Sequence, residues 1–182
     1  MAILPITIYG DAILRKKAQK VEKMDAETKK LIKDMFDTMD NASGVGLAAN
    51  QVGSNKAIFV IDVSEVEGLE HIKPFACINP KITEKSEEIV KMDEGCLSIP
   101  GIKNSVMRPK GIKLIYQNEK LEQCEITDES FLARVLQHEY DHLQGVFFTD
   151  LLDEESQKIL KKQLTRIKKR DFDCDYPVTD TD

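Results

Sequence analysis

Two of the chain's three histidines lie four residues apart in the segment HEYDH, residues 138–142. On a helix, positions four apart share one face with Cβ atoms about 5–6 Å apart, so His138 and His142 can bind one metal ion. Glu139 lies about 100° further around such a helix. That position disfavours it as a third ligand but lets it reach a water held by the ion. The pattern is typical of a metal-dependent hydrolase with a carboxylate base.

The residues around the histidines predict a helix that is buried in the core. We expect it to run from about Asp128, as the N-cap, to Leu143, and Gln144-Gly145 to end it. Apolar residues recur here at helical spacing, and the histidines fall on or beside the stripe formed by Phe131, Leu132, Val135, Leu136 and Leu143. Ionisable groups in a core helix need partners, which disfavours a chance pair of histidines on a solvated face.

Two histidines leave a metal site incomplete, and the sequence offers two sources of a third ligand. Glu154 and Glu155 lie downstream, where zinc endopeptidases place a glutamate, but they begin the next predicted helix. Cys96 lies upstream between a glycine and a strand-like Leu-Ser-Ile, and it is the stronger candidate. A lone cysteine is more often a small buried hydrophobe, so the residues alone leave the choice open. His71 stands apart and is expected to be an ordinary surface or loop histidine.

The remaining pattern predicts an α+β fold, with short mixed or antiparallel sheets around the central metal-binding helix. An N-terminal helix is expected over 25–42 and a C-terminal helix over 153–170. Strands are expected over 57–63, 75–82, 89–91, 112–117 and 121–126. Breaks between them are expected at Asn79-Pro80, Gly101 and Pro109-Lys110-Gly111. We expect one catalytic domain over residues 1–170, followed by an acidic tail over 171–182 that frays.

Composition narrows the class of protein. The chain has 182 residues, of which 41% are hydrophobic and 32% charged, with a net charge of −6. These values exclude a fibrous or wholly disordered chain, and they disfavour nucleic-acid binding driven by overall charge. No apolar run approaches the roughly 20 residues of a membrane span. The four cysteines form no C-x-x-C pair and no signal peptide is evident, so we expect reduced thiols and a cytoplasmic protein.

Three segments occur in an order that resembles the bacterial type-1 peptide deformylases. They are GVGLAANQ at residues 44–51, EGCLS at 94–98 and QHEYDH at 137–142. The start of the chain, from Ile3 to Arg15, is also similar, so the resemblance covers about residues 3–150. It implies an enzyme that removes the formyl group from N-formylmethionine of new polypeptides and releases formate.

The resemblance also implies a role for individual residues. Cys96, His138 and His142 would bind one divalent metal ion, ferrous iron natively, although zinc, nickel and cobalt suit the same ligands. Glu139 would be the general base and acid, while Gln51 and the backbone N–H of Leu97 would hold the developing oxyanion. The substrate would be contacted by Val45, Gly46, Glu94, Gly95, Phe131, Arg134 and Val135. Plain core packing is an equal alternative for the apolar members of this set, as is a solvated surface position for Arg134.

The residues also allow three other interpretations. Residues 44–49 also fit the loose G-x-G-x-x-A pattern of dinucleotide binders, which requires a preceding strand and a following helix. Here a predicted helix precedes the glycines and a strand follows them. A zinc endopeptidase that does not use Cys96 is a second alternative. A structural metal site is a third, but such sites normally have four protein ligands and only three can be named here.

The predicted C-terminal helix carries seven basic and no acidic residues over 156–170. A solvated helix face is the ordinary explanation for such a charge run. The resemblance suggests a second use, because the formylated nascent peptides that would be the substrate emerge from the ribosome, whose RNA a basic helix can contact. We expect a monomer with no membrane association.

Overall fold

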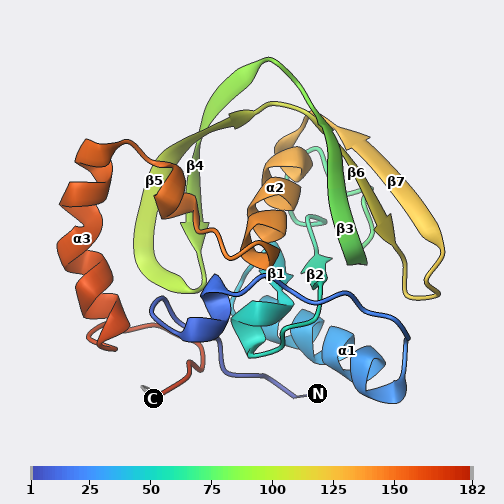
Figure 1. Ribbon diagram of the computed structural model, residues 1–182, viewed down its shortest axis with the longest axis horizontal. Helices are drawn as coiled ribbons and strands as arrows, with labels where there is room; N and C mark the ends of the chain where they lie inside the picture. Colours follow the sequence, from blue (N-terminus) through green and yellow to red (C-terminus); the bar gives the residue numbers. More distant parts are fainter. Residues whose placement is uncertain (1, 181–182) are drawn as a thin grey trace.

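The computed structural model describes residues 2–180, which form an α+β fold (Figure 1). Its helices and strands follow the chain in the order α1 (Ala26–Asn41), β1 (Gly46–Ala48), β2 (Ile58–Ile61), β3 (Phe75–Lys85), β4 (Ile89–Cys96), β5 (Ile99–Pro109), β6 (Ile112–Gln117), β7 (Gln123–Asp128), α2 (Phe131–Leu143) and α3 (Glu154–Lys168). Short 3-10 helices lie at Ala12–Arg15, Ala49–Val52 and Phe148–Leu151. None of the helices within residues 2–180 combines the length and apolar character that a bilayer crossing requires.

A five-stranded antiparallel sheet, in the order β1-β2-β3-β6-β7, is covered by a helix on each face. Successive strand residues point to opposite faces, so the fully buried strand β2 serves both. Phe59 and Ile61 pack in the cluster that contains the apolar residues of α2. Ile58 and Val60 pack in a second cluster with the apolar face of α1. This explains why β2 is apolar throughout instead of alternating.

The second sheet is the antiparallel pair β4-β5, and α2 lies between it and the larger sheet (Figure 1). On the side of the hairpin the helix makes polar contacts. Arg134 donates to the backbone carbonyls of Val90 on β4 and Val106 on β5, at 2.8 and 3.0 Å. The helix is thus held by apolar packing on one side and by hydrogen bonds on the other, which confirms the predicted central helix.

The prediction that Asn79-Pro80 breaks the chain is wrong, because β3 continues through both residues. Asn79 adopts a positive φ of 52° and the pairing with β6 shifts register between Ile78 and Lys81, as in a β-bulge. Its side chain stabilises the bulge by exchanging hydrogen bonds with the backbone of Val21 and donating to Gln117 at 2.7 Å. Proline is tolerated where the ladder is already interrupted.

Strand β5 was not predicted, because Gly101 was expected to end strand structure there. Gly101 lies within β5 at a φ of 74°. Cys96 pairs with Ile99 but Gly95 pairs with Lys103, so the residues between Ile99 and Lys103 bulge out of the ladder. A glycine accommodates that backbone conformation without strain. The bulge lies next to Cys96, where the chain turns from β4 into β5.

The helix α2 begins later than predicted. Ser130, not Asp128, is its N-cap, and the Ser130 side chain accepts from the backbone N–H of Leu132. Asp128 still contributes, since its carboxylate accepts from the backbone N–H groups of Ser130 and Ala133 at 2.7 and 3.0 Å. Asp25 caps α1 as predicted, whereas α3, predicted over 153–170, has Asp153 as its N-cap and ends at Lys168.

The C-terminal tail, which was expected to fray, contacts the N-terminal segment over residues 171–180. Val178 forms a parallel bridge with Ile6, and the backbone N–H of Thr179 donates to the carbonyl of Ile6 at 3.0 Å. Acidic composition suggested a solvated tail, but its apolar residues Phe172, Tyr176 and Val178 pack against a buried cluster. Residues 181–182 lie outside the described part of the chain. A catalytic domain boundary at residue 170 stays a prediction.

Candidate metal centre

Cys96, His138 and His142 come together at the junction of β4, β5 and α2. One potential ligand atom from each lies within 4.8 Å of the others. The Cys96 Sγ lies 3.2 Å from His142 Nε2, and the two imidazole rings are 5.0 Å apart at their centroids. The helix supplies both nitrogens from one face, as their spacing predicted, while the end of β4 supplies the sulfur.

Glu94 orients the first of these imidazoles. Its carboxylate is buried and its Oε2 lies 2.9 Å from His138 Nδ1, which leaves His138 Nε2 for the ligand position. Burial alone would raise the pKa of Glu94, but hydrogen bonds with His138 and Arg108 outweigh it and hold that pKa well below its usual range. The residue is therefore ionised, and it acts as the carboxylate partner that metal-binding histidines commonly have.

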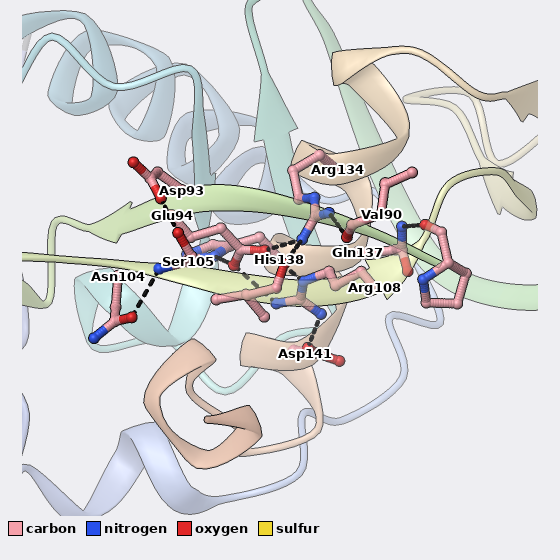
Figure 2. Close-up of polar contacts among 12 residues, drawn as sticks. Val90, Asp93, Glu94, Asn104, Ser105, Arg108, Arg134, Gln137, His138 and Asp141 are labelled. Carbon is pink, nitrogen blue, oxygen red and sulfur yellow. Dashed lines mark hydrogen bonds and ion pairs between the residues drawn. The ribbon is translucent and has the colours of Figure 1, made fainter. Parts of the chain in front are cut away.

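Two buried arginines balance the charge of Glu94 (Figure 2). Arg108 donates to both Glu94 oxygens, at 2.6 and 3.0 Å, and also to Asp141 at 2.6 Å. Arg134 donates to Glu94 Oε1 at 2.9 Å. The alternative of a solvated surface position for Arg134 is wrong, because its side chain is only 4% exposed and its guanidinium is committed to Glu94 and to backbone carbonyls.

His142 is buried more deeply than His138. Burial lowers its pKa well below the ordinary value because a desolvated imidazolium is unfavourable, so the ring is neutral and suited to ligation. Its Nδ1 has no hydrogen-bond partner among residues 2–180. Asn50 donates to the backbone carbonyl of His142 at 2.5 Å and fixes this turn of α2 against the 3-10 helix after β1.

Glu139 lies beside the ligands in an environment suited to proton transfer. It is 4% exposed, and its Oε2 is buried without a hydrogen-bond partner in the described chain. Burial raises the pKa of Glu139 to about 7, against the opposing effect of His138. A Cβ placed on Gly46 would lie 2.6 Å from Glu139 Oε1, so only glycine leaves room for this carboxylate.

These groups border a cavity of about 740 Å³. All of the predicted site residues except His142 line it, and Leu97 and Tyr176 form part of its wall. The predicted apolar members Val45, Phe131 and Val135 are among the lining residues. Glu94 also lines the cavity, although its two oxygens are engaged by arginines and by His138.

Gln51 is held with its amide nitrogen toward the sulfur. Its Oε1 accepts from the backbone N–H of Ala48 at 2.8 Å, which leaves Nε2 pointing the other way. Nε2 donates to Ser98 Oγ at 3.1 Å and lies 3.6 Å from Cys96 Sγ. Gln51 is only 2% exposed, so it is not a solvated loop residue.

The other candidate residues lie outside the ligand cluster. Glu154 and Glu155 are exposed on α3 and are absent from the ligand cluster, whereas Cys96 is present. His71 is exposed, as expected. Residues 44–49 follow α1 and enter β1, so they do not form the strand-to-helix turn of a dinucleotide site. No role was predicted for Asn50, Ser98 and Tyr176, since a single polar residue carries no spacing pattern that indicates its partner.

The chemistry of the donor set fits a divalent metal ion. One thiolate and two imidazoles suit iron, cobalt, nickel and zinc, and three protein ligands leave a coordination position open. Burial lowers the pKa of His138, but contacts with Cys96 and Glu94 outweigh it and raise that pKa. Metal binding must therefore displace a proton from this cluster.

Comparison with known proteins agrees with this geometry. The family profile described as polypeptide deformylase matches residues 3–158. The chain belongs to the polypeptide deformylase family. A peptide deformylase of Chlorobaculum tepidum is 42% identical over 176 residues, which are 97% of this chain and 94% of that protein.

Solved structures of deformylases share the fold. A peptide deformylase from Ehrlichia chaffeensis superposes with a TM-score of 0.84 at 37% identity. The match covers 93% of this chain and 99% of that protein's chain. One from Synechococcus elongatus, in complex with actinonin, gives a TM-score of 0.81 at 40% identity, with coverages of 88% and 87%.

The ligand cluster predicts that metal content depends on one cysteine. Replacing Cys96 by alanine removes a ligand, and the metal retained after dialysis, measured by atomic emission, is expected to fall at least about tenfold. Cys124→Ala is the matched control, because Cys124 lies on β7 outside the cluster, and it should retain the wild-type content. A Cys96→Ala protein with undiminished metal would contradict the assigned ligand set.

Proposed function

We propose that this chain is a metal-dependent amide hydrolase that removes the formyl group from N-formylmethionine of newly synthesised polypeptides and releases formate. The observation that carries the proposal is the convergence of Cys96, His138 and His142 beside the buried carboxylate of Glu139, in a chain of the polypeptide deformylase family. The cavity of about 740 Å³ is large enough for a side chain and the adjoining peptide.

Glu139 is the proposed general base and acid. When bound, a divalent ion lowers the pKa of water and polarises the substrate carbonyl. Glu139 accepts a proton from the attacking water and delivers it to the departing amine. A carboxyl pKa of about 7 supports this role, because such a group can both accept and return a proton near neutral pH.

Gln51 and the backbone N–H of Leu97 are the proposed donors to the developing oxyanion. Support comes from the hydrogen bond that fixes Gln51 Oε1 and turns Nε2 toward Cys96. Both residues line the same cavity as Glu139. Such preorganised donors stabilise charge only as it develops, which lowers the barrier without tightening ground-state binding.

The side chain of methionine is proposed to lie against Val45, Phe131 and Val135. These apolar residues line the cavity, while Gly46 and Gly95 let an extended peptide approach the backbone closely. Glu94 and Arg134 then shape the wall without offering their charges to the substrate, since both are engaged with each other.

Formate release is expected from a formyl-Met peptide and is expected to stop when a chelator removes the metal. Glu139→Ala should lower turnover by about 10²–10⁴, because the proton-transfer group is lost. Enzymatic detection of formate measures both effects. Glu154→Ala is the matched control and should keep wild-type turnover, because Glu154 is exposed on α3.

A fall of less than tenfold in Glu139→Ala, with metal content unchanged, would refute the assigned base. Cleavage of internal peptide bonds without formate release would favour an endopeptidase.

Ferrous iron is the proposed native metal. The support is chemical: a single thiolate with two imidazoles suits Fe²⁺, although zinc, nickel and cobalt suit it as well. An iron-loaded protein should lose activity in air or peroxide, since both the ion and the Cys96 thiolate oxidise, while a zinc-loaded sample should resist. Iron would be overturned as the native metal if protein purified without reloading held only zinc and was both fully active and resistant to peroxide.

We further propose that the chain is a monomer, located in the cytoplasm where nascent chains are made, and that α3 contacts ribosomal RNA. Most of the seven basic residues over 156–170 are exposed on α3 or just after it. Phosphate contacts made by such residues weaken steeply with salt.

Charge reversal at Lys161 and Lys162, both to glutamate, should reduce co-sedimentation with ribosomes. Reversal at the exposed Lys16 and Lys17 is the matched control, and it should have little effect. If both variants co-sedimented with ribosomes equally and independently of salt, the proposed contact would be refuted.

A further inference from the structure

The tail after α3 returns to the cavity. It turns at Arg170, which adopts a positive φ of 59°, and runs back along the N-terminal segment. In Figure 1 the segment that follows α3 runs below the β4-β5 hairpin in this view. This tail, residues 171–180, lies beyond residues 3–158 matched by the family profile.

Both ends of the tail are anchored independently of the cavity. At the near end, Arg170 donates to Asp11 at 2.6 Å and to the carbonyl of Thr179 at 2.8 Å. At the far end, Thr179 Oγ1 donates to Asp11 at 2.7 Å, and Ile6 exchanges backbone hydrogen bonds with Pro177 and Thr179. The residues between these anchors are therefore held in place, although α3 has ended.

Between the anchors, Tyr176 reaches the cavity. Its hydroxyl donates to the backbone carbonyl of Leu97 at 2.8 Å, and its ring lies among the residues that line the cavity. Tyr176 and Leu97 also pack in the same apolar cluster, together with Cys96 and Ile99. The tyrosine thus contacts the segment that carries both a metal ligand and a proposed oxyanion donor.

We propose that Tyr176 is a positioning residue for the Cys96–Ser98 segment. Through this residue, the C-terminal tail contributes to the geometry of the active site. The proposal rests on the proposed function, in which the Leu97 N–H stabilises the oxyanion. It places no chemistry on Tyr176 itself.

The geometry explains why such a brace is needed. The segment lies at the bulge where β4 turns into β5, so regular ladder pairing is interrupted there. Gln51 holds it through Ser98 Oγ, and Tyr9 holds it by donating its backbone N–H to the carbonyl of Ser98 at 2.8 Å. Tyr176 supplies the corresponding contact at Leu97. A donor misplaced by even a fraction of an ångström loses much of its effect on the transition state.

The test is Tyr176→Phe, which keeps the ring and removes the hydroxyl. Hydrogen–deuterium exchange followed by mass spectrometry should show amide exchange in residues 95–99 faster by about three- to tenfold, because one hydrogen bond is lost. With a formyl-Met peptide, kcat should fall by a similar factor and KM should stay unchanged. Tyr176→Ala, which also removes the wall, should raise KM in addition.

Tyr116→Phe is the matched control, because Tyr116 is a half-buried tyrosine on β6 that does not line the cavity. It should change neither exchange at 95–99 nor kcat. Unchanged exchange in Tyr176→Phe would overturn the positioning role, and so would faster exchange with an unaltered kcat. If the wild type released no formate, the proposed function would fail, while the exchange result would still decide whether Tyr176 braces the segment.

Discussion

The buried carboxylate of Glu94 is the group on which the geometry of the candidate metal centre depends. It accepts hydrogen bonds from Arg108 and Arg134 and lies against His138 Nδ1. One buried anion therefore contacts two guanidinium groups and one candidate metal ligand. Removing a charge from water costs several kcal/mol, which only well-made partners offset. Because Glu94 lies on β4 and the arginines lie on β5 and α2, the same contacts that balance charge also join the hairpin to the helix.

This arrangement couples the fold to the chemistry. The helix α2 packs its apolar side on the large sheet and presents its polar side to the hairpin, so the imidazoles meet the sulfur in the interior. Close packing then sets the remaining requirements. Gly46 must lack a side chain to admit Glu139, and Gln51 must be fixed at its oxygen to direct its nitrogen.

Much of the site could be predicted from the sequence, because its residues occur as local patterns. The i,i+4 histidines predicted the helix that contributes two candidate ligands, and the apolar stripe placed that helix in the core. The assignment of Cys96 needed the resemblance to a known family, since nothing in a lone cysteine distinguishes a ligand from a buried hydrophobe. The element types were also predictable, and α1 and β6 lie almost where expected.

What could not be predicted depends on contacts between distant segments. Asn79-Pro80 and Gly101 suggested breaks, but bulges absorb them within β3 and β5. The sequence left a solvated surface position open for Arg134, because its buried partner Glu94 lies 40 residues away in the sequence. The acidic composition of the tail favoured fraying, because composition reports only on the segment itself. The residues that hold the tail, Ile6 and Asp11, lie at the other end of the chain.

The central claim is that one sulfur and two imidazole nitrogens from separate segments bind a single ion. X-ray absorption at the metal edge of the loaded protein tests it most directly. We expect one sulfur neighbour at about 2.3 Å and two imidazoles, with the sulfur contribution lost in Cys96→Ala. A first shell made only of nitrogen and oxygen in the wild-type protein would contradict it.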